Sequence, residues 1–308
     1  MERHIDRRSF LNTTGGFAAG ALTLGAFSET MRPDAAWAAP GAGARQPAKV
    51  PHPVSDRVLD QLKTRLMFQI SVDVPTIELG LSVAAAALAG GVNIVEMGTP
   101  LLKNQGVANV VPAFRRKFPE ALLLADMKTM DGGAFEARAV YTGGGNIFDF
   151  LALAGVDTAK AICGVRDEFR RTDAELPRLV FADIMVPHQG PPAQAADVAR
   201  RMLDAGVDAV GVHLQADARR ADPSLLEGHM LADAVRAIFE KVGAAAPVQV
   251  VGGLSVAQAK NLAQAGLRAF VISGNLGQAD TRARYDLPAD QIERLVAGFI
   301  AEVSSAAK

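Results

Sequence analysis

Cysteine, aromatic residues and net charge are all scarce in this 308-residue sequence. The one cysteine, Cys163, has no second cysteine with which to form an internal disulfide. The formal net charge is −1, which gives no basis for a general attraction to nucleic acid or to an anionic membrane surface. Aromatic residues make up only 6% of the chain, and its many alanines, glycines and valines suit close packing of helices on a parallel sheet.

Apolar residues are abundant, at 49% of the sequence against 21% charged residues. This balance is typical of a soluble globular protein that buries a substantial core. One large domain is expected over residues 59–308, because α/β barrels use roughly 200 to 250 residues as a single unit.

The first 38 residues have the composition of an export signal. Residues 7–11, RRSFL, resemble the twin-arginine motif, an apolar stretch follows from 10 to 27, and AWA at 36–38 is typical of a cleavage site. We therefore expect a periplasmic protein without stable membrane insertion, since a spanning helix needs about 20 predominantly apolar residues. A cytoplasmic protein, or one anchored in the membrane by an uncleaved signal, is the alternative. Residues 39–58, rich in Ala, Gly and Pro, predict a flexible linker.

Eight short apolar runs follow, separated by stretches with helical periodicity. The runs are LMFQISVD (66–73), VNIVEMG (92–98), ALLLADMK (121–128), NIFDFLAL (146–153), RLVFADIM (178–185), DAVGVHL (208–214), VQVVGG (248–253) and RAFVISG (268–274). Between them lie helix candidates such as 76–90, 193–206 and 255–266, which end at glycine. The alternation predicts a (β/α)8 TIM barrel.

Unusual polar groups gather where these predicted strands end. They are Asp73, Glu96, Asp126 with Lys128, Asp183, His213, Gly252–Gly253 and Gly274–Asn275. In a TIM barrel the carboxyl ends of the strands form the active site, so we expect these groups to meet in one mouth.

The segment DMKTMD, residues 126–131, concentrates the chemistry. Side chains two apart on a strand share a face, so Asp126 and Lys128 should point into the mouth while Met127 turns to the helices. Asp131 follows in the loop. Glu96, on the neighbouring strand, can meet Asp126, and two such oxygen ligands suit Mg²⁺. An ion pair that only closes the barrel top is the structural alternative.

His213 ends the sixth predicted strand, where an imidazole can exchange a proton near neutral pH. His188 follows the fifth strand and is a candidate for a lid. The other histidines have weaker claims, because His4 is in the leader, His52 in the predicted linker and His229 on an expected helix surface.

Glycines after the seventh and eighth strands predict a phosphate site. Gly252, Gly253 and Gly274 stand where strand meets helix, so that backbone N–H groups can hold an anion. Arg219 and Arg220, after the sixth strand, could add a guanidinium contact to phosphate. The alternative for both arginines is a solvated loop.

The motifs DMKTMDGGAFEA, EMGTPLLKNQG, GVH and VGGL together resemble the 3-hexulose-6-phosphate synthases, within the orotidine 5′-phosphate decarboxylase suprafamily, over residues 64–280. The resemblance implies a lyase that joins formaldehyde to the enediolate of ribulose 5-phosphate, a phosphorylated ketose, with Mg²⁺ as cofactor. The implied roles are site lining for Asp73, metal ligation for Glu96 and Asp126, enediolate stabilisation for Lys128, reach into a homodimer partner's site for Asp131, proton transfer for His213, and phosphate binding for Gly252, Gly253, Gly274 and Asn275.

Related activities differ at single positions. Orotidine decarboxylases place a lysine at the end of the second strand, where this chain has Glu96. The 3-keto-L-gulonate-6-phosphate decarboxylases carry an arginine three residues beyond the histidine, where this chain has Ala216. Relatives often carry Arg or a small residue where this chain has Asn275. A decarboxylase-like lyase and an exported, non-catalytic ligand-binding barrel therefore stay open as alternatives.

Overall fold

A computed structural model describes residues 50–222, 224–227, 229–278, 280 and 282–307. The expected signal peptide, residues 1–38, and the linker residues 39–49 lie outside the described residues, so both stay predictions.

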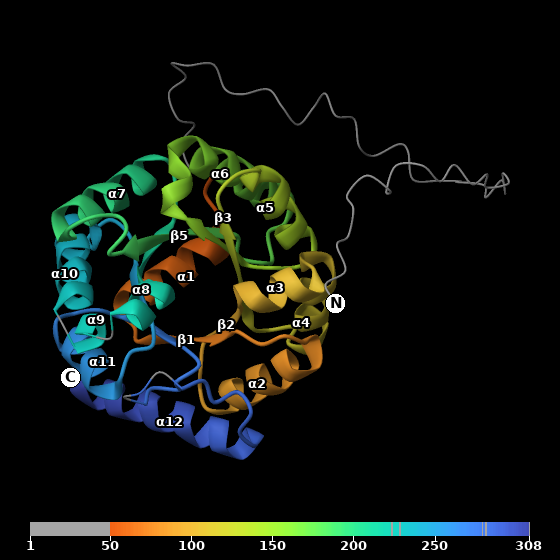
Figure 1. Cartoon of the computed structure of the whole chain (residues 1–308). Helices are drawn as coiled ribbons and strands as arrows, with labels where there is room; N and C mark the ends of the chain where they lie inside the picture. Colours follow the sequence, from red (N-terminus) through yellow and green to blue (C-terminus); the bar gives the residue numbers. More distant parts are fainter. Residues whose placement is uncertain (1–49, 223, 228, 279, 281, 308) are drawn as a thin grey trace, which may run out of the picture. The chain divides into compact units, whose positions relative to one another are not determined.

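Eight parallel strands close into a barrel in the order of the sequence, with the last strand paired to the first (Figure 1). The strands are β1 Met67–Val72, β2 Ile94–Met97, β3 Leu122–Thr129, β4 Ile147–Leu151, β5 Leu179–Val186, β6 Ala209–Leu214, β7 Val248–Val251 and β8 Ala269–Ile272. Each falls within or next to a predicted apolar run, so the TIM-barrel prediction is confirmed.

Most helices surround the strands, and α1 lies across one end of the barrel (Figure 1). They are α1 Pro53–Thr64, α2 Ile77–Ala89, α3 Thr99–Gln105, α4 Val107–Lys117, α5 Gly133–Thr142, the short 3-10 helix η2 Ala152–Ala154, α6 Gly155–Thr172, α7 Pro192–Asp204, α8 Ala216–Ala221, α9 Ser224–Glu227, α10 Met230–Val242, α11 Val256–Gln264 and α12 Ala289–Ala306. None of the helices in the described ranges is both long and apolar enough to cross a membrane.

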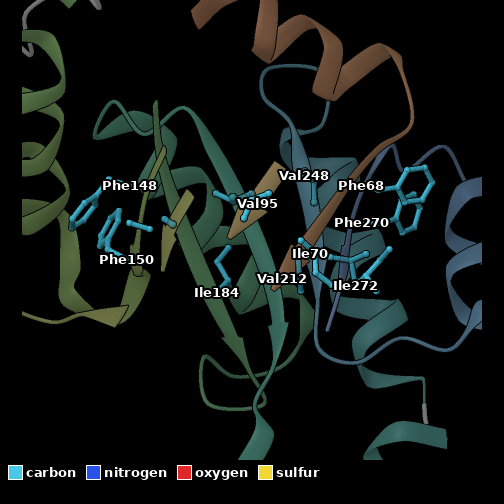
Figure 2. Close-up of a cluster of buried hydrophobic side chains, with 14 of the residues drawn as sticks. Phe68, Ile70, Val95, Phe148, Phe150, Ile184, Val212, Val248, Phe270 and Ile272 are labelled. Carbon is cyan, nitrogen blue, oxygen red and sulfur yellow. The ribbon is translucent and has the colours of Figure 1, made fainter. Parts of the chain in front are cut away.

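The main apolar core lies between the strands and the helices. Figure 2 shows ten labelled side chains from this layer, including Phe68 and Phe270, whose rings stack 6.0 Å apart. Alternate strand residues point the other way, as the period of a β-strand requires. The outward residues of all eight strands are therefore apolar, which leaves the inward positions available for polar groups.

A smaller apolar cluster fills the barrel interior near the amino ends of the strands. It joins Met67, Ile94 and Leu179 with other strand residues and with Val58 and Leu62 of α1. Helix α1 therefore plugs this end of the barrel, which we call the bottom.

The plugging helix corrects part of the predicted linker. Residues 53–58 form the first half of α1 rather than flexible chain, because Val58 faces the barrel interior. His52 is also misplaced by the prediction: it is only 2% exposed, and its ring nitrogens contact Ser55 Oγ at 2.8 Å and the Asp173 carbonyl oxygen at 2.7 Å. It is a structural histidine that fixes the start of α1.

One kind of side-chain-to-backbone hydrogen bond repeats around the bottom of the barrel. Asn93, Asn146 and Asp208 each stand just before a strand, and each accepts a hydrogen bond from a backbone N–H near the start of the preceding strand. The donors are the amides of Phe68, Leu123 and Val180, at 2.8 to 2.9 Å. These side chains satisfy amides that would otherwise be unpaired at the barrel's end.

Candidate active site at the barrel mouth

Lys128 enters the mouth through a break in the regular strand. The pairing of β3 with β4 shifts register between Asp126 and Thr129, and Lys128 has a φ of 49°, in the left-handed region. This conformation is unfavourable for a residue with a Cβ and is found preferentially at functional sites. Simple alternation along the strand predicted that the side chains of Asp126 and Lys128 meet. The bulge is what directs the ammonium between two strands.

The Lys128 ammonium bridges two carboxylates. Its Nζ lies 2.6 Å from Asp126 Oδ1 and 2.9 Å from Asp183 Oδ2, and its side chain is 19% exposed. Burial alone would lower the pKa of Lys128, but the charges of Asp183 and Asp126 raise it well above its usual value. Lys128 is therefore a fixed cation.

Asp183 links this cation to the predicted histidine. His213 Nδ1 donates to Asp183 Oδ2 at 3.0 Å. Burial alone would raise the pKa of Asp183, but Lys128 and His213 outweigh it and lower the pKa below its usual range. A side chain at Gly211 would come within 2.5 Å of Asp183 Oδ1, so β6 needs a glycine opposite this carboxylate.

Glu96 is buried and held by inward polar residues of neighbouring strands. It accepts hydrogen bonds from Gln69 Nε2 at 2.5 Å and from Ser71 Oγ at 2.9 Å, and Gln249 Nε2 in turn donates to Gln69 Oε1 at 2.9 Å. Burial, then Asp126 and Asp73, raise the pKa of Glu96 well above its usual value. The strand-end pattern did not predict this polar layer, although Gln69, Ser71 and Asp73 alternate visibly in QISVD.

The predicted metal ligands fit a hard cation. Asp126 is 5% exposed and accepts from Thr99 Oγ1 at 2.8 Å, so its carboxylate is oriented, and Glu96 is close enough for the two charges to interact. A set of oxygen donors with excess negative charge suits Mg²⁺. Among the described residues, the group of three acids whose carboxylate oxygens lie within 4.8 Å of one another is Asp126, Asp149 and Asp183, which does not include Glu96. Lys128 already occupies the place between two of its members.

Asp149 is the one buried acid of the mouth that our sequence reasoning passed over. It lies on β4 directly beside Asp126 of β3, and its Oδ1 has no hydrogen-bond partner among the described residues. Burial, followed by the charges of Asp183 and Asp126, raises the pKa of Asp149 well above its usual value. A lone carboxylate inside the apolar run IFDFL was the available signal.

Asp73 stands exposed just past β1 and accepts a hydrogen bond from Ser71 Oγ at 2.8 Å. A side chain at Gly98 would collide with the Asp73 carboxylate, which explains the glycine of the EMGTP motif. Tyr285 closes this side of the mouth, since its hydroxyl donates to the Ser71 carbonyl oxygen. The structure therefore places Asp73 beside Glu96, as the strand ends predicted.

The predicted phosphate turns are well formed. Gly252 and Gly253 have φ of 127° and 70°, values that favour glycine. Asn275, in contrast, faces the protein: its Nδ2 donates to the carbonyl oxygens of Gly253 at 3.0 Å and Gln278 at 2.7 Å. Asn275 therefore ties the two turns together, and its amide nitrogen is already engaged. Gly274 packs against Tyr285.

The two arginines after β6 lie in different environments. Arg219 Nη1 donates to the Gly252 carbonyl oxygen at 3.0 Å, whereas Arg220 pairs with Asp217 at 3.0 Å on the surface, with side chains 76% and 81% exposed. The solvated-loop alternative thus describes Arg220 only.

Three polar residues considered from the sequence lie outside the central cluster. Asp131 is exposed in the β3–α5 loop, where its Oδ1 accepts from the Gly132 amide at 2.8 Å. His188 is exposed after β5, and His229 is exposed at the start of α10. Nothing in their contacts brings these three side chains to Lys128.

The sequence that forms this barrel and its mouth matches a known protein family. Residues 66–285 match the Orotidine 5′-phosphate decarboxylase / HUMPS family, and the chain belongs to it.

Individual relatives within this family include several 3-hexulose-6-phosphate synthases. The 3-hexulose-6-phosphate synthase of Methylomonas aminofaciens is 28% identical over 200 residues, covering 65% of this chain and 86% of that protein. The same enzyme of Mycobacterium gastri is 33% identical over 93 residues, 30% of this chain and 44% of that one. A crystal structure of 3-hexulose-6-phosphate synthase superposes with a TM-score of 0.61 at 25% identity, over 79% of this chain and all of that one.

Proposed function

We propose that this protein is a lyase with 3-hexulose-6-phosphate synthase activity, joining D-ribulose 5-phosphate to formaldehyde. The observation that carries the proposal is the convergence of Lys128 with Asp126, Asp183 and His213 in one mouth. Relatives of this name support it, one of them covered over 86% of its length. Two residues argue against the decarboxylases. Glu96 stands where the orotidine decarboxylases have a lysine, and Ala216 stands where the 3-keto-L-gulonate-6-phosphate decarboxylases have an arginine.

The proposed reaction requires one proton to move and one negative charge to be stabilised. A proton leaves C1 of ribulose 5-phosphate, the resulting enediolate carbon attacks formaldehyde, and a proton ends on the new alkoxide oxygen. His213 donates its Nδ1–H to Asp183, which leaves Nε2 to exchange that proton. The Lys128 ammonium is fixed and charged, so it stabilises the enediolate as it forms.

Mg²⁺ fits the oxygen donors of Glu96 and Asp126, with Asp73 nearby. When bound there, the ion would polarise substrate oxygens as a Lewis acid. The residues contribute placement: Thr99 orients Asp126, and Ser71 with Gln69 orient Glu96. Such supporting hydrogen bonds fix the direction of a ligand's lone pairs.

Formaldehyde consumption tests the proposed activity. Purified protein with Mg²⁺ is expected to consume formaldehyde only when ribulose 5-phosphate is present, and the hexulose phosphate should accumulate in equal amount. A panel of other phosphorylated keto sugars and keto acids serves as the control for substrate class. If formaldehyde is not consumed at any Mg²⁺ concentration, the synthase proposal is wrong, and release of CO₂ from a keto acid phosphate would favour a decarboxylase.

We also propose a homodimer formed around Asp131. The exposed large hydrophobic residues of the described chain are Met130, Phe135 and Leu153, at 53%, 70% and 45% exposure. All three follow the adjacent strands β3 and β4, so they lie at the same end of the barrel around Asp131. Exposed apolar patches of this kind mark contacts with another protein surface.

Sedimentation and activity together test the dimer. Phe135→Asp is expected to produce monomers by introducing a charge into the patch, and Asp131→Ala is expected to lower activity without dissociating the dimer. Mixing Asp131→Ala with Lys128→Ala protein should restore part of the activity if Asp131 serves the partner's site. A monomeric wild-type protein would contradict the proposal.

Export by the twin-arginine route remains a proposal that rests on residues 7–11. Cell fractionation of the full chain tests it. Replacing Arg7 and Arg8 together by lysine should retain the protein in the cytoplasm, and retention of the unaltered chain there would contradict export.

A further inference from the structure

The loop after β6 places one arginine directly over the predicted phosphate turn. We propose that Arg219 is the phosphate-binding cation of this enzyme and sets its preference for phosphorylated ligands. The inference rests on the proposed function in one respect, because the phosphate that Arg219 binds is taken to be that of the sugar substrate. Its basis is the position and bonding of Arg219 itself.

Arg219 touches both glycines of the turn. Its Nη1 donates to the Gly252 carbonyl oxygen at 3.0 Å, and a side chain on Gly253 would collide with the same nitrogen. Gly253 also has a φ of 70°, so both its backbone and its lack of a Cβ serve the approach of the guanidinium. The turn and the arginine therefore form one constructed site.

Most donors of this guanidinium are unused. Arg219 Nε is buried without a hydrogen-bond partner, and no ion pair of Arg219 is found within the described residues. Burial, followed by the charge of Arg220, lowers the pKa of Arg219, as expected for a cation without a neutralising carboxylate. A buried donor without a partner is costly unless a ligand completes it, and phosphate accepts from a guanidinium through two parallel hydrogen bonds.

The other groups at this turn cannot supply the missing charge. The Gly253 amide donates to Ser273 Oγ at 3.2 Å, and the Asn275 amide nitrogen donates to the carbonyl oxygens of Gly253 and Gln278. Arg284 Nη2 pairs with Asp280 at 2.7 Å, so this cation is already neutralised. Arg219 is thus a cation whose guanidinium contacts this turn and has no carboxylate partner among the described residues, so we assign it to a dianionic phosphate there.

Arg220 provides a matched control. It is the next residue of the same short helix, α8, but its side chain is 76% exposed and paired with Asp217. Replacing Arg220 removes the same formal charge from the same segment without touching the turn. A difference between the two positions therefore reports on the site rather than on net charge.

Binding of inorganic phosphate to the full chain is the test, measured by isothermal titration calorimetry. Arg219→Ala should weaken phosphate binding by about 10- to 100-fold, the range for lost hydrogen bonds to charged groups. Arg219→Lys should weaken it less, because lysine keeps the charge without the bidentate geometry. Arg220→Ala should stay within about twofold of wild type, since it is a surface residue. Melting temperatures of all variants establish that they fold.

The outcomes separate this inference from the proposed activity. Equal phosphate affinity in folded Arg219→Ala and wild-type protein overturns the role of Arg219 and leaves the synthase proposal intact. Selective weakening by Arg219→Ala, together with no formaldehyde consumption by wild type, upholds the phosphate site and removes the synthase proposal. A wild-type protein that binds no phosphate overturns the inference outright.

Discussion

The two ends of this barrel both bury charged groups but satisfy them differently. Of the buried side-chain atoms without a hydrogen-bond partner in the described residues, four belong to the mouth and its loops, namely Asp149 Oδ1, Asp183 Oδ1, Arg219 Nε and Asn275 Oδ1. Only Arg178 Nε lies at the bottom. Nearly all buried polar atoms of the bottom are hydrogen-bonded within the protein, while several at the mouth are left for a ligand to bond.

The bottom shows what a structural ion network looks like. Asp208 lies between Arg166, at 2.9 Å, and Arg170, at 3.2 Å, and all three side chains are at most 1% exposed. Asp208 Oδ2 also accepts from the Val180 amide at 2.8 Å. Each carboxylate oxygen has a defined donor, and α1 covers this end of the barrel interior. Such a network supports the fold and leaves nothing for a ligand to complete.

The mouth instead concentrates acids around one lysine. Asp126, Asp149 and Asp183 converge there, and the pKa of Asp149 is raised by burial and by its acidic neighbours. Like charges in a buried site raise the free energy of the empty protein. A cation or an electron-poor substrate group lowers it, and this difference separates a functional end from a structural one.

The largest expected effect is on turnover and comes from Lys128. Lys128→Ala should lower kcat by about 100- to 1,000-fold, because it removes a fixed positive charge at the developing enediolate. Formaldehyde consumption with ribulose 5-phosphate measures the change. Lys103→Ala, an exposed lysine on α3, is the control and should keep normal activity. Equal activity in the two variants would assign the Lys128 ion pairs to structure.

Substitutions at the bottom of the barrel should affect stability more than turnover. Asp208→Ala is expected to lower the free energy of unfolding by about 3 to 5 kcal/mol, since it leaves buried Arg170 without an ion pair among the described residues and Arg166 with Asp167 alone. Urea denaturation measures the loss. Asp204→Ala, which breaks the exposed pair with Arg200, should cost less than about 1 kcal/mol. If Asp208→Ala abolished turnover while the protein stayed fully stable, the division between the two ends would be wrong.

Two acids of the mouth should differ from each other. Asp183→Asn removes a charge that pairs with Lys128 and orients His213, so kcat should fall by about 100-fold or more. Asp149→Asn should change stability by about 1 kcal/mol or less, because the raised pKa of Asp149 favours its protonated form and asparagine is close in shape. Activity and urea denaturation of both variants check this order. Equal effects would mean that both acids are charged.

The smallest expected effect is a dependence of stability on pH through Glu96. Its pKa is raised well above 4.5 by burial and by Asp126 and Asp73. An acid with a raised pKa stabilises the fold while it is protonated, so its contribution is lost as pH rises through that raised pKa. Metal-free protein should therefore melt at lower temperature toward high pH, whereas Mg²⁺ affinity should increase over the same interval as Glu96 loses its proton.

Melting curves between about pH 5 and pH 9, with Mg²⁺ or with a chelator, measure both trends. Glu96→Gln should flatten the pH dependence of the chelated protein and weaken Mg²⁺ binding. An Mg²⁺ affinity that does not change with pH would contradict the raised pKa of Glu96.

Much of the mouth could be predicted from strand ends alone. Asp73, Glu96, Asp126 and His213 were found because eight apolar runs define where each strand stops. Asp149 was missed because it lies inside an apolar run rather than at its end, and Gln69 because the polar alternation of QISVD begins inside the strand while the prediction considered strand ends only. Asn275 was assigned to the phosphate, yet its amide nitrogen bonds to backbone carbonyl groups that the sequence does not bring into view.

The sequence by itself determined the barrel, its order of strands and the rim on which the polar groups stand. These features follow from hydrophobic periodicity, which is a local property of the chain. The tertiary structure decided which groups are partners: the left-handed Lys128 between two acids, α1 as the plug, and Arg219 rather than Arg220 over the glycine turn. Closing the barrel sets these contacts, because distances between residues on different strands depend on register and loop path rather than on local pattern.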